Sequence, residues 1–448
     1  MDGATEMILT VPRDDAGLIA IEYLRTEGAP EYSCEFVEAL QTKLEGTEAA
    51  QFLSAAPVAY YLFRVPMGIE NDVAERLQGD FNGEGPRPGR ILAAEVNYLM
   101  ELSQPTPPDF TLGGKHSDYL KMMNVPDAHA DGVTGAGRTI AIVDTGIEPA
   151  HGATVQEMVD VLQNPVLRNA AHQDDKGHGT AMALLAREVA PDATIYAVRI
   201  SDRNSPVNVY GVIAGVFVAA IDCMADVVNL SLGFEKIRKC GVCGASGAVR
   251  SRALETALRI AQLRGPQSSA QPALLYAAAM GNGGTASGLD HPARYPCTVP
   301  VGSVDSSGKR SAFSNYDRAN PHKDHMMAPG GQTSGQSVTE ATGSWASTGT
   351  QCHGTSAATA YASGMLALLW SDSRYAALDA DAFLTAVKAS HCSRQSGQRV
   401  DEHGSGLIRY EPPSTTGTAG SSGGTQAATL EFVEDGVYVG DVFLEIKT

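Results

Sequence analysis

Short apolar runs and alanine-rich stretches of helical length alternate through the middle of the chain. Residues 138–144, with the sequence RTIAIVD, end an almost unbroken apolar run in an aspartate, which is typical of a buried strand. Residues 178–189 and 357–369 are apolar and alanine-rich, which predicts two helices, and residues 253–263 predict a third. Because open α/β sheets place their sites at the carboxyl ends of strands, Asp144 is a first candidate for chemistry.

The first hundred residues follow a different pattern, in which shorter elements are separated by Gly and Pro. Five elements are expected there: helices at 15–25, 35–44 and 71–78, and strands at 58–65 and 91–98. Prolines at 105, 107 and 108 then interrupt the pattern and indicate a linker.

A chain of 448 residues exceeds the ~250–300 residues that one hydrophobic core usually serves, so we expect several domains. The breaks in the pattern predict an N-terminal domain at 1–103, a linker at 104–118, a large domain at 119–395, a flexible Ser/Thr/Gly-rich segment at 396–428 and a C-terminal β-hairpin at 429–448.

The chain is acidic, and much of the excess lies near its N-terminus. Lys and Arg number 33 against 51 Asp and Glu, a net charge of −18, and residues 1–103 alone hold 7 against 18, or −11. This balance argues against nucleic acid and against an anionic membrane as partners. No apolar run reaches the ~18 residues of a membrane span, and the N-terminus lacks the basic and apolar regions of a secretory signal. Together with an odd count of seven cysteines, these features predict a cytoplasmic protein.

Three short segments, far apart in the chain, carry the groups of a hydrolytic site. They are IVDTG at 142–146, GHGT at 177–180 and HGTSA at 353–357, which supply Asp144, His178 and Ser356. Serine alone is a poor nucleophile, so acyl transfer needs a histidine to take its proton and a buried carboxylate to orient the imidazole. Ser356 also stands at the start of a predicted helix, where free backbone N–H groups favour a developing oxyanion.

In their order and in their neighbouring residues, these segments resemble the subtilisin-like serine proteases, or subtilases. Four further segments extend the resemblance over roughly residues 119–370; they are VVNLSLG at 227–233, AAAMGN at 277–282, VGSVD at 301–305 and MAPG at 327–330. The resemblance implies a three-layer α/β fold with a mainly parallel central sheet, preceded by a small α+β domain. It also implies a hydrolase that acts as a serine endopeptidase on protein or peptide substrates.

The same resemblance assigns roles to individual residues. His178 takes the proton of Ser356, Asp144 orients His178, and Asn282 binds the oxyanion together with the Ser356 N–H. A substrate is expected to pair as an added strand, with its side chains in pockets. The substrate-binding residues implied in this way are Ser231, Leu232, Gly233, Ala279 and Gly281.

The chain departs from the family pattern at four positions. Ala181 stands where the family often has a second histidine, and Ala357 and Ala360 replace a usual methionine and proline. Met280 is bulkier than the small residue usual at its position, which leaves the neighbouring specificity pocket undetermined. Two alternatives therefore stay open: a regulatory or scaffolding protein that keeps the fold without turnover, and a latent protease that a protein partner activates.

Residues 58–98 form a predicted β-α-β pattern just ahead of the protease-like region, where many subtilases carry an inhibitory propeptide. Residues 95–98, EVNY, resemble the closing strand of such a propeptide. In that case residues 98–102 lie in the substrate cleft as an extended tail. The expected self-cleavage then falls after Leu102, before Ser103. The alternative is an accessory domain that never enters the cleft.

Two other motifs allow different chemistry. Asp-Thr-Gly is also the aspartic-protease signature, but that mechanism needs two such carboxylates, and no second Asp-Thr-Gly or Asp-Ser-Gly occurs. Cys240 and Cys243 have CxxC spacing, which suits half of a zinc site, a redox pair or a strained disulfide, while a glycine-rich loop with two free thiols is the alternative. We expect no cofactor. Structural calcium is frequent in the family, but no Asp/Asn-rich loop identifies a site.

Overall fold

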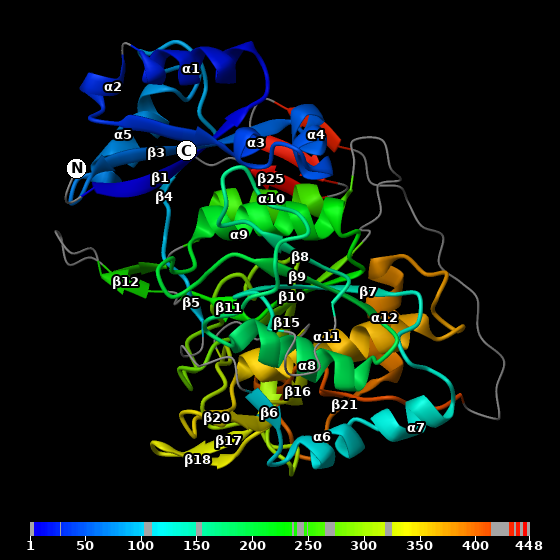
Figure 1. The fold of residues 1–448 in the computed structure, drawn as a ribbon. Coiled ribbons are helices and arrows are strands. Elements are labelled where there is room, and N and C mark those ends of the chain that lie inside the picture. Colours follow the sequence, from blue (N-terminus) through cyan, green and yellow to red (C-terminus); the bar gives the residue numbers. More distant parts are fainter. Residues whose placement is uncertain are drawn as a thin grey trace.

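The computed structural model describes residues 4–26, 28–102, 110–148, 155–234, 237–239, 246–248, 250–264, 274–318, 325–413, 430–433, 436–439 and 442–445. Two sheets organise most of these residues (Figure 1). A four-stranded sheet lies in the N-terminal unit, which we define as residues 4–102. A nine-stranded sheet lies in the main unit, which we define as residues 110–413.

The nine-stranded sheet is parallel except at one edge. Its order is β21 (Cys392–Ser393), β22 (Leu407–Ile408), β16 (Met326–Pro329), β15 (Val299–Val304), β14 (Leu275–Ala279), β10 (Val227–Leu230), β7 (Thr139–Asp144), β9 (Thr194–Arg199) and β8 (Glu157–Asp160). Among these pairings only that of β21 with β22 is antiparallel. The central strands β10, β14 and β15 are buried along their whole length, which explains their continuous apolar sequences.

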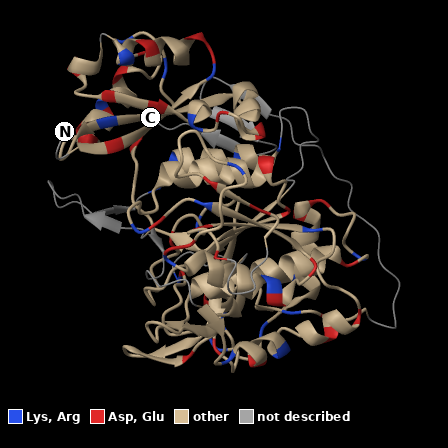
Figure 2. Ribbon diagram, viewed as in Figure 1, with Lys and Arg blue, Asp and Glu red and all other residues tan. Residues whose placement is uncertain are grey.

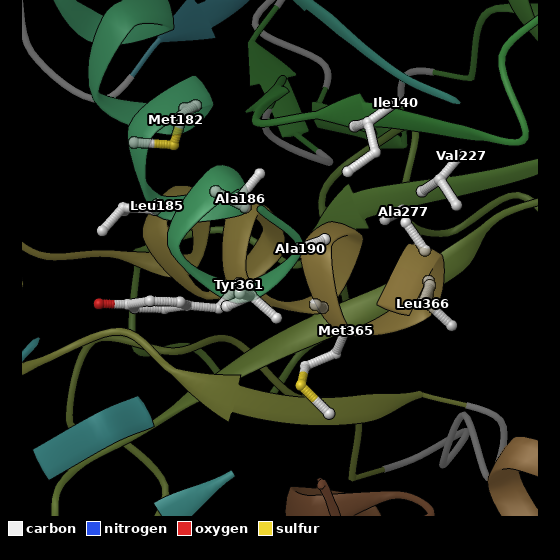
Figure 3. Close-up of a cluster of buried hydrophobic side chains, with 14 of the residues drawn as sticks. Ile140, Met182, Leu185, Ala186, Ala190, Val227, Ala277, Tyr361, Met365 and Leu366 are labelled. Carbon is white, nitrogen blue, oxygen red and sulfur yellow. The ribbon is translucent and has the colours of Figure 1, made fainter. Parts of the chain in front are cut away.

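Helices cover both faces of this sheet. They are α8 (His178–Val189) and α11 (Thr355–Ser371) on one face, and α9 (Val209–Phe217) and α10 (Arg252–Gln262) on the other. Alternate strand residues divide between the two cores: Ile140 of β7 packs with α8 and α11, as Figure 3 shows, whereas Val143 packs with α9 and α10. The three-layer α/β fold expected from the sequence is confirmed.

The carboxyl end of the sheet gathers three of the predicted site residues. Asp144 is the last residue of β7, His178 is the first residue of α8, and Ser356 is the second residue of α11. Helices α8 and α11 approach closely at Gly364, where a Cβ atom would lie 2.7 Å from the carbonyl oxygen of Ala186. Glycine at this position permits the contact.

The N-terminal unit is a four-stranded antiparallel sheet with helices on its outer face. The strand order is β2 (Glu35–Ala39), β3 (Val58–Pro66), β1 (Ala4–Pro12) and β4 (Ala93–Val96), and the outer helices are α1 (Asp15–Arg25) and α5 (Glu70–Asp80). Met7 and Leu9 face these helices, whereas Ile8, Tyr60 and Leu62 join the buried cluster of α9 and α10. The sheet therefore packs its inner face directly on two helices of the main unit (Figure 1). Asp and Glu residues are distributed over its elements (Figure 2).

One expectation for the N-terminal unit was wrong, and one element was missed. The helix expected at 35–44 is a strand, Glu35–Ala39, followed by the short helix α3 (Leu40–Lys43), and the strand Ala4–Pro12 was not anticipated. Helix periodicity in so short a segment is overridden by tertiary context, because residues 35–39 pair with β3 across a bulge. A second short helix, α4 (Glu48–Ala55), follows α3 and packs against η2 (Val218–Asp222) of the main unit.

Two expected boundaries also have to move. Within the expected linker at 104–118, the structure places strand β6 (Phe110–Leu112), paired with β19 (Gly343–Trp345), and helix α6 (His116–Met122). Within the segment expected to be flexible at 396–428, it places α13 (Val400–His403) and β22 of the large sheet. Two residues such as Leu407 and Ile408 are too few to show a period, and they form a strand by pairing with β16 and β21.

Near the C-terminus, the expected hairpin gains a third strand. Strands β23 (Leu430–Val433), β24 (Gly436–Val439) and β25 (Val442–Glu445) pair antiparallel in that order. Across the part of the chain that the structure covers, no helix has the length and apolar character needed to cross a membrane.

Candidate active site

Asp144 and His178 form a buried pair at the carboxyl end of the sheet. The His178 Nδ1 atom lies 2.8 Å from Asp144 Oδ1 and 3.0 Å from Oδ2, and neither side chain is appreciably exposed. The Thr145 backbone N–H donates to the same Oδ1 at 2.8 Å. With Nδ1 donating to the carboxylate, His178 carries its acceptor at Nε2, which is buried and makes no hydrogen bond within the described residues.

The backbone around His178 is held by a second carboxylate. Asp174 accepts hydrogen bonds from the N–H groups of Gly177 at 2.7 Å and Thr180 at 2.8 Å, so it caps the start of α8. Gly179 must be a glycine, because a Cβ atom there would lie 2.3 Å from the carbonyl oxygen of Gly146. The Gly-His-Gly sequence therefore brings α8 close enough to β7 for His178 to reach Asp144.

The environment of His178 favours its protonated form. Burial alone would lower the pKa of the imidazole, but the charge of Asp144 and the hydrogen bond to it oppose burial, and Asp174 adds to them. The net effect raises the pKa of His178 above its ordinary value. An imidazole in this setting is suited to accept a proton during a reaction.

Ser356 is held by Ser231, the first residue of the expected substrate-binding segment. Its Oγ donates to the Ser231 carbonyl oxygen at 3.0 Å, and Ser231 Oγ donates to the Ser356 carbonyl oxygen at 2.9 Å. The Asn229 amide also donates to Ser231 Oγ at 2.9 Å. Gly354, immediately before α11, has φ +131°, a conformation that favours glycine, and it sets the entry of the chain into the helix.

Asn282 is fixed against the first turn of α11. Its Oδ1 accepts hydrogen bonds from the Thr355 N–H at 2.8 Å and from Thr355 Oγ1 at 3.0 Å. Because the oxygen is held in this way, the orientation of the whole Asn282 amide is set relative to the helix start. The neighbouring Gly281 N–H donates to the same Thr355 hydroxyl at 3.2 Å.

The candidate catalytic side chains line a common pocket. His178, Asn282 and Ser356 all line it, with a wall of less polar residues made by Met182, Phe313, Trp345, Cys352 and Ala357. The structure thus brings the histidine, the serine and the asparagine to one surface, with Asp144 buried behind His178. Burial raises the pKa of the Cys352 thiol to about 12, so this neighbour of Ser356 remains protonated near neutral pH.

The expected substrate-binding segment is paired with the end of the N-terminal unit. Strand β11 (Leu232–Gly233) pairs antiparallel with β5 (Glu101–Leu102), with Leu102 opposite Leu232 and Glu101 opposite Gly233. Ser103 lies outside the described residues. The described chain resumes at β6, which pairs with β19, and Trp345 of β19 lines the pocket. Strands β5 and β6, which precede and follow residues 103–109, therefore pair with β11 and β19. Both of these partner strands border the site.

The remaining candidates belong to β14 and to the segment that connects it to Asn282. Ala279 ends β14, and Gly281 has φ +102°. The Met280 side chain is buried in the cluster of α9 and α10, and its sulfur lies near Gly302, so its bulk is directed into the core. Ala181 is fully buried between the layers.

Several positioning residues were not anticipated from the sequence. Asp174, Asn229 and Thr355 hold the candidate residues through hydrogen bonds to the backbone or to Ser231 and Asn282. Asp174 gave no signal in the sequence, because the N-cap position of α8 is Gly177 and Asp174 lies three residues before it. Asn229 gave none either, because its partner Ser363 lies 134 positions away.

The described cysteines, Cys34, Cys223, Cys297, Cys352 and Cys392, are free thiols. Cys240 and Cys243 lie outside the described residues. Within the described ranges, no group of three or more His, Cys, Asp or Glu side chains is placed to hold a metal ion.

Comparison with known proteins identifies the family to which the chain belongs. The model of the Subtilase family matches residues 135–399, more than half of the chain. Subtilisin E of Bacillus subtilis is 32% identical over 230 residues, covering 47% of this chain and 51% of that protein. M-protease of Shouchella clausii is 29% identical over 283 residues, covering 61% and 63%. The match spans about half the length of subtilisin E and of subtilisin NAT. The resemblance read from the sequence is confirmed: the chain belongs to the subtilase family of serine proteases.

Proposed function

We propose that the protein is a serine endopeptidase that cleaves peptide bonds through an acyl-enzyme on Ser356. The observation that carries the proposal is the buried Asp144–His178 pair behind a pocket that Ser356 and Asn282 also line. Each group has the chemistry that one step of acyl transfer needs.

In this mechanism, His178 Nε2 accepts the hydroxyl proton as Ser356 Oγ attacks the substrate carbonyl carbon. The hydroxyl must first turn from the Ser231 carbonyl oxygen, which it contacts at 3.0 Å. Asp144 holds the imidazole and stabilises the imidazolium, which the raised pKa of His178 favours. The carbonyl oxygen becomes an oxyanion that the Asn282 amide and the Ser356 N–H stabilise at the positive end of α11. The imidazolium then protonates the leaving amine, and water hydrolyses the ester by the same steps in reverse.

The substrate binds as an extended strand beside Ser231, Leu232 and Gly233. The antiparallel pairing of Glu101 and Leu102 with β11 supports this mode, because it uses the same backbone groups that a substrate would use. Ala279 and Gly281 form the opposite wall of the pocket that receives the side chain next to the cleaved bond.

The N-terminal unit acts as an inhibitory propeptide-like domain. Its last strand occupies β11, and its carboxylate and amide side chains cap two helices of the main unit. Glu95 accepts from the Arg252 N–H at 2.9 Å and from the Ser251 hydroxyl at the start of α10, and Asn97 Oδ1 accepts from the Tyr210 N–H at 2.9 Å in α9. The enzyme is therefore latent in this form until the tail is cleaved near Leu102–Ser103 or a protein partner displaces the domain.

Labelling with a fluorophosphonate probe tests the proposal, because the probe reacts only with an activated serine. We expect label on Ser356 in the wild type and none in Ser356→Ala. Since the tail competes with the probe, Leu102→Pro, which removes a backbone N–H and fixes φ within the segment paired with β11, should be labelled faster than the wild type. Absence of label from both the wild type and Leu102→Pro, with the fold intact, would favour the regulatory or scaffolding alternative.

A further inference from the structure

A carboxylate stands between the two walls of the proposed substrate pocket. A Cβ atom built on Gly281 would lie 2.0 Å from Asp290 Oδ2, and one built on Gly233 would lie 3.9 Å from the same oxygen. Gly233 belongs to the expected substrate strand and Gly281 to the opposite wall. Asp290 therefore places its negative charge where two glycines leave room.

The backbone fixes Asp290 in this position. Its N–H donates to the Met280 carbonyl oxygen at 3.1 Å, and the next residue, His291, exchanges two backbone hydrogen bonds with Phe234. The segment around Asp290 thus connects the residue before Gly281 to the residue after Gly233. The buried Asn315 amide donates to Asp290 Oδ1 at 3.2 Å and sets the orientation of the carboxylate.

A peptide bound as proposed directs one side chain toward this carboxylate. When a strand pairs with Ser231–Gly233 and presents its carbonyl to Ser356, the side chain of the residue at the cleaved bond, called P1, enters the gap between the walls. The two glycines contribute no side chain there, so a P1 side chain that enters between them would meet the Asp290 carboxylate, with the Asn315 amide beside it. An apolar side chain there would desolvate a carboxylate without compensating its charge, whereas a cation would pair with it.

We propose that Asp290 is the specificity-determining residue of this protease and that it selects a basic side chain, Arg or Lys, at P1. The inference rests on the proposed endopeptidase function and adds a substrate class to it.

The composition of the tail agrees with this selectivity. Between Arg90 and Lys115 the chain contains no Lys, Arg or His, so no residue around Leu102 offers a cation to Asp290. A tail that occupies β11 without a favourable P1 side chain is a slow substrate and hence an effective inhibitor. Because of this selectivity, the N-terminal unit should stay bound at the cleft longer than it would if its tail carried a basic residue at P1.

The carboxylate also has a structural partner in Asn315, so the test must separate charge from shape. Asp290→Asn keeps the size and can still accept from Asn315, but it removes the charge. Asp290→Glu keeps the charge. Asp127→Asn, at an exposed position of helix α7 (Val125–Ala130), makes the same chemical change away from the pocket and controls for the net charge of the chain.

The assay measures kcat/KM for peptide nitroanilides that differ only in P1, with Arg, Lys, Leu, Phe or Glu at that position, and with active enzyme counted by fluorophosphonate titration. We expect Arg and Lys to exceed Leu and Phe at least tenfold, Asp290→Asn to reduce that ratio at least tenfold, and Asp127→Asn to leave it unchanged. Equal or greater rates for Leu and Phe in the wild type, or an unchanged ratio in Asp290→Asn, would overturn the assignment.

A second measurement does not depend on a variant that folds. Benzamidine carries the planar cation of an arginine side chain, and benzamide is its neutral counterpart. We expect benzamidine to inhibit the wild type competitively and at least tenfold more tightly than benzamide; equal inhibition would count against Asp290. Failure of the proposed function has a different signature, because then Ser356 takes no fluorophosphonate and none of the peptides is cleaved.

Discussion

Replacing Asn282 with alanine tests the proposed oxyanion site most directly. The amide is expected to donate to the substrate oxygen only as negative charge develops on it, so the loss should appear in kcat and leave KM nearly unchanged. One such donor is typically worth about 10²–10³ in kcat, or about 2.7–4 kcal/mol. Substitution of Thr355 provides a second, milder test. Thr355 holds Asn282 Oδ1 through its N–H at 2.8 Å and through its hydroxyl at 3.0 Å, and the hydroxyl alone can be removed.

Thr355→Val removes the hydroxyl but keeps the N–H and the shape of the side chain. The change removes the hydrogen bond to Asn282 and also the acceptor of the Gly281 N–H. Loss of the bond to Asn282 is worth about 0.5–1.5 kcal/mol, so it should lower kcat about 2- to 10-fold, far less than Asn282→Ala. Thr355→Ser restores the hydroxyl and should restore most of the rate. If Asn282 only positions the turn, Asn282→Ala and Thr355→Val should have similar effects.

The assay is single-turnover acylation with a chromogenic peptide ester or amide, which separates binding from chemistry. Circular dichroism and thermal unfolding of each variant control for the fold. A loss in Asn282→Ala that lies wholly in KM would refute the oxyanion role and make Asn282 a residue that positions substrate. A loss below about fivefold in kcat would do the same.

Four further predictions concern the remaining site residues and the tail. Ser356→Ala should lower kcat by about 10⁶ without unfolding the protein, and more than a tenth of the wild-type rate in a contaminant-free preparation would contradict the assignment of the nucleophile. Activity needs neutral His178, whose pKa is raised, so kcat/KM should increase with pH through a midpoint above the ordinary histidine value of about 6.5. Asp144→Asn removes the main charge that raises this pKa, so its midpoint should move to lower pH while the rate falls about 10⁴-fold; a pH profile with an unmoved midpoint would show that Asp144 does not set this pKa. Intact-mass measurement after long incubation should reveal a fragment that begins within a few residues of Ser103 in the wild type and not in Ser356→Ala, whereas a wild type that stays whole and is fully active would make residues 1–102 an accessory domain.

The sequence predicted the parts of the molecule that local pattern determines. As predicted, residues 138–144 contain a buried strand that ends in Asp144. The alanine-rich stretches after His178 and Ser356 are helices on one face of the large sheet. Continuous apolar runs and glycines at close approaches carry this information within a few residues. The order of the motifs along the chain then predicted the family.

Features that depend on long-range partners were not predictable in the same way. Residues 35–39 form a strand only because β3 lies beside them, and Leu407 and Ile408 extend the sheet only because β16 provides an edge. Asp290 gave no signal in the sequence at all. It lies eight residues after Asn282 in a loop, and its proximity to Gly233, 57 positions earlier, exists only in the folded chain.

The interface between the two units explains how a tail can be held without a favourable P1 residue. Glu95 and Asn97 cap helices α10 and α9 of the main unit, and in return Asp222 of η2 accepts from the Glu48 and Ala49 N–H groups at 2.8 and 3.2 Å, at the start of α4 in the N-terminal unit. Each unit therefore completes helix ends of the other, and separating them would expose these backbone donors together with an apolar sheet face. Because docking draws on this interface, the tail need not bind through its own side chains. The substrate pocket is then free to prefer a residue that the tail does not contain, and selectivity and inhibition can be set by different parts of the same chain.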